Sequence, residues 1–171
     1  MDLYQIFITH NRSWTIRESF FAILFLIAAM YAWKMIRKNK IMPSQAAAGM
    51  ALLLFLGIVF GSTVFTRTPT GRHYRLELFW SWKAVFNGNR NLLKENLLNC
   101  ALLIPMGLLL PIMLNRKISW WKGMLMGVVV SAVIETCQLA LCRGLFEWDD
   151  MIHNGIGCMI GCMIMSSGKK F

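Results

Sequence analysis

Long apolar blocks limit the folds that this chain can adopt. Along its 171 residues, stretches of about twenty mostly apolar residues alternate with polar segments. A helix rises about 1.5 Å per residue, so about twenty residues cross a hydrocarbon core roughly 30 Å thick. Only 15% of the residues are charged, whereas soluble domains carry about 25%. We therefore predict a polytopic membrane protein and exclude an ordinary water-soluble globule.

The blocks divide the chain into five expected spans, at about residues 19–35, 46–65, 96–114, 120–142 and 151–167. The last is the least apolar, because it opens with His153 and Asn154. The expected fold is all-α, a membrane helix bundle that forms a single domain over residues 1–171, with two N-terminal spans in residues 1–70. Amphipathic indoles favour the headgroup layer, and tryptophans lie near the expected span ends (Trp14, Trp33, Trp120, Trp121 and Trp148).

Basic residues predict the orientation of these spans. Lys and Arg divide equally between the two sides, but one side packs them into short segments such as KMIRKNK at 34–40. Short, dense basic loops stay in the cytoplasm. We therefore expect a plasma-membrane protein with its N-terminus outside and its C-terminus inside. The net charge of +10 then reflects topology, and no nucleic-acid partner is expected.

A carboxylate interrupts the fourth span. Glu135 lies in GVVVSAVIETCQLALC, and Gly123, Gly127 and Ser131 precede it at steps of four residues. An ionised side chain at mid-bilayer costs about 2.5–3.5 kcal/mol on insertion scales, so such residues face protein or water and often mark a site. The spacing places the small residues and the carboxylate on one helix face.

The last span carries a second stripe of this kind, formed by Asn154, Gly157 and Gly161. Small residues at such spacing let two helix backbones approach closely. We predict that the fourth and fifth spans pack together through these stripes. Packing alone is the simpler interpretation of the glycines.

The second loop and the third span carry further signals. In YRLELFWSWKAVFN, residues 74–87, apolar side chains recur at helical spacing, which predicts an amphipathic interfacial helix. An irregular loop with exposed aromatic residues is the alternative. Pro105 and Pro111 each remove a backbone donor, and we expect them to kink the third span.

Polar residues from three spans should meet at one leaflet. Asn96 and Asn99 lie in the first turn of the third span, Glu135 and Gln138 lie one to two turns before the end of the fourth, and the fifth opens with Asp150, His153 and Asn154. Because these ends lie on the same side of the bundle, we predict a polar pocket that opens to that leaflet. Arginines on the same side would supply positive charge (Arg67, Arg75 and Arg143).

Two segments resemble a known family. NCALLIPMGLLLP, residues 99–111, resembles the N-x-x-x-[FL]-[IV]-P-x-G-x-x-x-P signature of VanZ-like membrane proteins. Residues 131–161 resemble its S-x-x-x-E-x-x-Q segment and the acidic D-x-x-D-x-x-x-N-x-x-G-x-x-x-G segment that follows. Glu147 stands where the family commonly has Asp, and His153 is not required by the pattern. The resemblance covers roughly residues 75–165 and includes Arg75.

The resemblance implies a small bacterial multi-spanning protein linked to lowered susceptibility to the glycopeptide teicoplanin. We consider first that the pocket binds an anionic lipid-linked ligand, such as a cell-wall precursor or a phospholipid head group. Arginines would bind its phosphate or carboxylate. The ligand-binding residues expected are Asn99, Glu135, Gln138, Arg143, Asp150, Asn154, Arg75 and Arg67.

Two other interpretations stay open. In an intramembrane lipid hydrolase or transferase, Glu135 would act as general acid or base, with Asp150 and His153 as further catalytic candidates. The sequence contains no recognisable nucleophile motif. Alternatively, the protein is a non-catalytic subunit or adaptor of an envelope complex. No cofactor and no metal are expected, and the five cysteines lie in or beside apolar segments, as packing residues do.

Overall fold

The computed structural model describes residues 16–69 and 71–168 of the chain as a bundle of helices with one small sheet. The expected all-α membrane bundle is confirmed, because four helical segments are long and apolar enough to cross a membrane: Ser19–Arg37, Pro43–Phe65, Arg90–Leu114 and Trp120–Ala140. The expected interfacial Trp14 lies outside the described residues.

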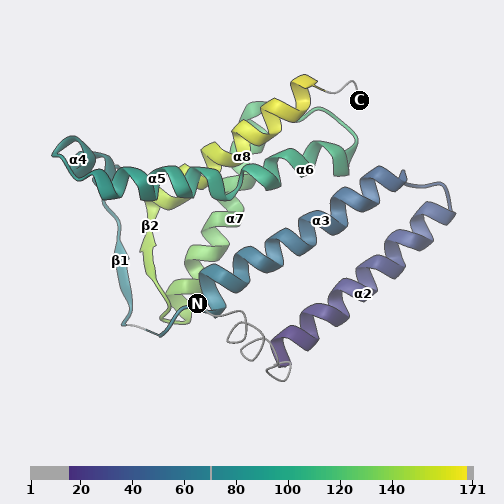
Figure 1. Cartoon of the computed structure of the whole chain (residues 1–171), viewed down its shortest axis with the longest axis horizontal. Coiled ribbons are helices and arrows are strands. Elements are labelled where there is room, and N and C mark those ends of the chain that lie inside the picture. The colour runs from purple at the N-terminus through teal and green to yellow at the C-terminus, as the bar shows by residue number, and fades with distance from the viewer. Residues whose placement is uncertain (1–15, 70, 169–171) are drawn as a thin grey trace, which may run out of the picture.

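The N-terminal half is a helical hairpin. Helix α2, Ile16–Arg37, and helix α3, Pro43–Phe60, run side by side at one edge of the molecule (Figure 1). Pro43 occupies the first turn of α3, where its missing N–H costs nothing. A π-helical turn, η1, Gly61–Phe65, extends α3, and the side chain of Gln45 donates to the carbonyl oxygen of Met113. The α3 helix thereby packs on the rest of the bundle.

The expected third span is divided into two helices. Helix α5, Arg90–Leu102, begins six residues before the expected start at Asn96, and helix α6, Ile104–Leu114, follows after Leu103. The interruption arises because Pro105 has no N–H for the carbonyl one turn earlier, and Leu103 leaves helical geometry with φ −102° and ψ 9°. Pro111 lies inside α6. The two prolines were expected to kink this span, and the interruption at Leu103 agrees with that expectation, since Arg90–Leu114 still forms one apolar helical segment.

The C-terminal half forms the centre of the bundle. Helix α7, Trp120–Ala140, packs on helix α8, Trp148–Gly168, and α8 also packs on α5 and α6. The expected fifth span is therefore helical. Its composition nevertheless leaves α8 out of the four candidate spans, since its first two turns carry Asp149, Asp150, His153 and Asn154.

The two glycine stripes pack on different partners. The predicted contact between the fourth and fifth spans is confirmed, because a Cβ at Gly127 would lie 2.6 Å from Cys158 Cβ and 2.9 Å from Gly155 Cα of α8. The second stripe faces elsewhere: a Cβ at Gly157 would lie 1.8 Å from the Cys100 carbonyl oxygen, and one at Gly161 would lie 2.3 Å from that of Ile104. The Gly157 stripe therefore receives the broken α5–α6 segment and not α7.

The second loop contains a strand that the sequence did not predict. Strand β1, His73–Arg75, pairs in parallel with strand β2, Leu145–Glu147, so that Arg75 lies opposite Glu147. The amphipathic helix expected over 74–87 is limited to α4, Trp80–Phe86. In Figure 1 the two strands and α4 lie at the end of the molecule opposite the α2–α3 turn.

Candidate functional site

The buried polar face of α7 is the base of the candidate site. Ser131, Glu135 and Gln138 are all buried, and Glu135 is only 3% exposed. Glu135 Oε2 accepts a hydrogen bond from the backbone N–H of Glu147 at 3.1 Å. Gln138 Nε2 donates to the carbonyl oxygen of Thr63 at 3.0 Å. The face predicted from residue spacing thus connects α7 to both β2 and η1.

The first turns of α8 add further polar side chains to this face. Together these residues form what we call the polar layer: Asn99, Ser131, Glu135, Gln138, Asp150 and Asn154. Asn99 Nδ2 donates to Asp150 Oδ1 at 2.5 Å, and Asn154 Nδ2 donates to Ser131 Oγ at 2.8 Å. The five polar residues expected to converge therefore lie in one connected region, built from α5, α7 and α8. Asn99 pairs with Asp150, whereas Asn154 bonds to Ser131, and Glu135 and Gln138 bond to backbone groups of Glu147 and Thr63, so these contacts also stabilise the packing of the helices.

Asp149 organises a second network that the sequence did not identify. Its carboxylate accepts hydrogen bonds from the N–H of Phe79 at 2.6 Å, from the N–H of Ser81 at 3.1 Å and from the Ser81 hydroxyl at 2.6 Å. Asn96 Nδ2 donates to the same hydroxyl at 3.2 Å. Phe79 has a left-handed φ of 59°, so this carboxylate holds a sharp reversal at the start of α4.

His153 belongs to this second network. Its Nε2 atom accepts a hydrogen bond from the Trp82 indole at 2.8 Å, and the two rings meet edge-on with centroids 5.9 Å apart. An acceptor at Nε2 places the proton of a neutral imidazole on Nδ1, and Nδ1 is buried without a hydrogen-bond partner. His153 therefore contacts an indole and not the hydroxyl of a serine nucleophile.

Three arginines surround the polar layer in different ways. Arg143 donates to the carbonyl oxygen of Phe65 at 2.5 Å, which ties the end of α7 to η1. Arg75 is exposed, and its guanidinium lies 3.9 Å from the centre of the Trp80 ring. Arg67 is exposed and close enough to act electrostatically on Glu135 and Asp150. Two guanidinium groups thus face solvent above buried carboxylates.

Arg67, Arg75 and the buried carboxylates form no ion pairs within the part of the chain that the structure describes. The one salt bridge found there joins Lys83 to Glu77 at 2.5 Å, and both of these side chains are largely exposed. Arg67 and Arg75 thus approach the carboxylates without forming ion pairs with them. A guanidinium prefers bidentate contact with a carboxylate or phosphate, so both groups retain the capacity to bind an anion.

Glu147 lies between the strands and the polar layer. Burial and the nearby Asp150 raise the pKa of this carboxyl to about 7, while Arg75 and Trp80 act in the opposite direction. The group therefore exchanges its proton near neutral pH. Across residues 16–69 and 71–168, no three His, Cys, Asp or Glu side chains are arranged to hold a metal ion.

The sequence placed Asn96 at this leaflet without its bond to Ser81, and it missed the residues whose role depends on long-range contacts: Ser81, Trp82 and Asp149. The adjacent acidic pair 149–150 at the start of a helix was the available signal, since acidic side chains favour helix N-termini. The structure brings Asn99, Glu135, Gln138, Asp150 and Asn154 together, with Arg67 and Arg75 at the exposed edge, and places Arg143 in a contact with the backbone. An open pocket at this end of the bundle stays a prediction.

Comparison with known proteins supplies the family. The model of the VanZ/LLP1 family matches residues 23–168, which include most of the two N-terminal spans as well as the segments around the polar layer. Searches of the curated proteins and of the solved structures gave no significant match. The match covers far more than half of the chain and agrees with the motif residues now seen in contact. The chain therefore belongs to the VanZ/LLP1 family.

Proposed function

We propose that this protein binds an anionic, lipid-linked ligand of the bacterial cell envelope at the leaflet that faces the polar layer, and that binding lowers susceptibility to glycopeptides such as teicoplanin. The observation that carries the proposal is the pair of exposed guanidinium groups, Arg67 and Arg75, which form no ion pair with any residue that the structure describes, although buried carboxylates lie nearby. Family membership supports the link to glycopeptides.

The polar layer gives the ligand site its shape in this proposal. Gln138 and Arg143 fix η1, which leads directly to Arg67. Glu135 and the β1–β2 pairing fix Glu147, which lies opposite Arg75. Both arginines therefore lie on backbone segments that these hydrogen bonds hold in place, which reduces the entropy lost on binding. Asn99, Asp150 and Asn154 hold α5 and α8 in register beneath them.

The membrane placement is part of the same proposal. The protein lies in the bacterial plasma membrane with its N-terminus outside and its C-terminus inside, so the polar layer faces the outer leaflet. The dense basic segments after α2 and before α7 support this orientation. Lipid-linked wall precursors exposed at that leaflet are ligands of the required charge.

The test is a titration of the purified full chain in detergent with a polyprenyl phosphate, with the uncharged polyprenyl alcohol as comparator. Hydrogen bonds to charged groups contribute about 1.5–3 kcal/mol, so removal of both arginines should weaken binding about 100-fold. The pair of substitutions is Arg67→Gln with Arg75→Gln. The matched control, Arg72→Gln with Arg90→Gln, removes two exposed charges from the same side.

The control pair should change the affinity less than about twofold, a loss too small to reflect a direct contact. If both pairs of substitutions weaken ligand binding equally, the attraction comes from the overall positive charge, and the proposed site at Arg67 and Arg75 is wrong. Equal affinity for the phosphate and the alcohol would exclude recognition of the head group.

The enzyme interpretation has one supporting observation, the pKa of Glu147 raised to about 7 by burial, which suits a general acid or base. It predicts a released product when the purified protein is incubated with bacterial lipid extract. Ligand retention without product would favour binding. An adaptor instead predicts loss of function when a partner is deleted and tolerance of conservative changes in the polar layer.

A further inference from the structure

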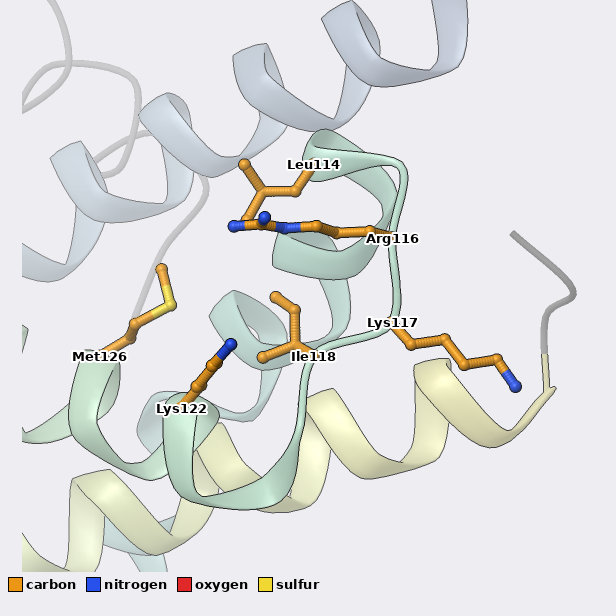
Figure 2. Close-up of a pocket in the computed structure, with 6 residues that line it drawn as sticks. All are labelled: Leu114, Arg116, Lys117, Ile118, Lys122 and Met126. Atoms are coloured by element: carbon orange, nitrogen blue, oxygen red, sulfur yellow. The ribbon is translucent and has the colours of Figure 1, made fainter.

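A second charged site lies at the other end of α7. The turn between α6 and α7 forms a pocket of about 90 Å³ lined by Leu114, Arg116, Lys117, Ile118, Lys122 and Met126 (Figure 2). Lys122 lies sixteen residues before Gln138, so about 24 Å of helix separate this pocket from the polar layer at 1.5 Å per residue. The two sites therefore face opposite leaflets.

The pocket combines positive charge with an apolar floor. Figure 2 shows the side chains of Arg116 and Lys122 reaching toward the same space, whereas Lys117 extends away from it toward the end of α8. Ile118 is buried, and Leu114 and Met126 are partly buried beside it. A volume of about 90 Å³ is several times the roughly 10–15 Å³ that admits one water. The space therefore admits a phosphate-sized group.

Among the residues that the structure describes, no acidic side chain forms an ion pair with the cations of this pocket. The sequence contains no Asp or Glu between residues 96 and 134, and none of the three cations forms an ion pair in the part of the chain that the structure describes. The first turn of α7 also lacks a side-chain cap at Ser119, so the positive end of its helix dipole adds to the field. The pocket is therefore complementary to an anion.

The turn is held in place by the neighbouring helix. The Ser166 hydroxyl of α8 accepts a hydrogen bond from the N–H of Ile118 at 3.1 Å and donates to its carbonyl oxygen at 3.4 Å. Trp120 and Trp121 follow at the start of α7, and both are exposed. Exposed indoles at a helix end indicate the headgroup layer. The pocket is thus fixed at the depth where lipid phosphates lie.

We propose that the α6–α7 turn binds the phosphate of an anionic phospholipid in the leaflet opposite the polar layer. Arg116 and Lys122 contact the phosphate, and the apolar residues Leu114, Ile118 and Met126 contact the start of an acyl chain. Basic pockets between membrane helices on the cytoplasmic side bind such head groups. This site is independent of the ligand proposed for Arg67 and Arg75.

The experiment counts bound lipid on the detergent-purified full chain by native mass spectrometry, with phosphatidylglycerol and phosphatidylcholine offered at equal concentration. Each basic residue near an anionic surface contributes about a factor of five in affinity. Arg116→Gln with Lys122→Gln should therefore weaken phosphatidylglycerol binding about 25-fold. Lys117→Gln should weaken it less than about fivefold, because its side chain points away.

The matched control is Lys38→Gln with Lys40→Gln, which removes two exposed charges from the α2–α3 turn on the same side. The proposed site is supported if this control pair retains phosphatidylglycerol binding and all variants keep an unchanged melting temperature. Equal loss in both pairs, or no preference for phosphatidylglycerol in the unaltered protein, would overturn it. Competition by millimolar inorganic phosphate as strong as by the lipid would also contradict a lipid site.

Discussion

Helices α2 and α7 are similar in length and both apolar, yet they have different roles in the molecule. In the apolar stretch of α2 that could cross a membrane, no residue is buried inside the protein, whereas 33% of the residues in the corresponding stretch of α7 are buried. The difference follows from small and polar residues: α7 presents Gly123, Gly127, Ser131 and Glu135 to its neighbours, and the hydrophobic α2 contacts mainly α3. A long apolar segment indicates a membrane span, and the small and polar residues within that segment indicate where the helix contacts other helices.

This contrast has a physical basis in the bilayer. Lipid tails are as apolar as leucine, so an apolar face gains little by leaving lipid for protein, and helices associate through close packing and hydrogen bonds. The contacts around α7 and α8 consist of glycine approaches and buried polar pairs. Substitutions there should therefore matter far more than substitutions in α2.

The largest effect is expected at Gly157 of α8. An added Cβ would lie 1.8 Å from the Cys100 carbonyl oxygen, a backbone atom, so Gly157→Ala must displace α5 from α8. The cost should exceed the roughly 1–3 kcal/mol of ordinary overpacking, and size-exclusion chromatography should show little folded protein. Gly61→Ala is the control, because nothing lies within 4 Å of its Cβ position. Normal folding of Gly157→Ala would refute the close contact.

Asp149→Ala should have the next largest effect. The substitution leaves three donors at the start of α4 without their acceptor, at about 3 kcal/mol for a buried charged hydrogen-bonding group. Thermal unfolding should show the loss, and trypsin should cleave faster after Arg72, Arg75 and Lys83. Glu77→Gln removes only an exposed salt bridge, worth about 0–1 kcal/mol. Equal stability of the two variants would contradict the role of Asp149.

A smaller effect concerns pH and Glu147. Its pKa is raised from 4.5 to about 7 by burial, so the folded chain binds the proton more tightly than the unfolded chain does. Stability is therefore greatest below pH 4.5 and falls as pH rises from 4.5 to about 7. The melting temperature should decrease between pH 5 and 8, and this slope should be shallower in Glu147→Gln. The exposed Glu77→Gln should retain the slope; an unchanged slope in Glu147→Gln would contradict the assignment.

The smallest effect is expected in α2. Leu24 is 42% exposed, so Leu24→Ala should change stability by less than about 0.5 kcal/mol. Leu110 of α6 is almost fully buried, and Leu110→Ala should cost at least about 2 kcal/mol through the cavity it leaves. Both values can be obtained from unfolding in detergent. A larger loss of stability in Leu24→Ala would show that α2 packs on a further partner and would contradict the difference between α2 and α7.

Features that depend on local periodicity could be predicted from the sequence. Apolar length predicted the spans, and a step of four residues predicted the buried face that carries Glu135. The family motif selected Asn99, Asp150 and Asn154; in the structure Asn99 donates to Asp150, and Asn154 donates to Ser131.

Other features depend on contacts between distant segments and left no periodic signal. Strands β1 and β2 have three residues each and pair across about seventy positions, so neither shows an alternating pattern. The role of Asp149 requires the reversal at Phe79, which neither segment indicates alone. The partner of the Gly157 stripe depended on the break at Leu103, because that break brings the α5–α6 carbonyl groups against α8.

We propose that the function of the protein depends on Arg67 and Arg75, which lie at the exposed edge of the polar layer. The most direct measurement is the teicoplanin susceptibility of bacteria that lack the endogenous protein and produce each variant at equal membrane level. The unaltered protein and the Arg72→Gln, Arg90→Gln pair should raise the inhibitory concentration equally, and the Arg67→Gln, Arg75→Gln pair should give the value of cells without the protein. Full protection by the Arg67, Arg75 pair would contradict the claim.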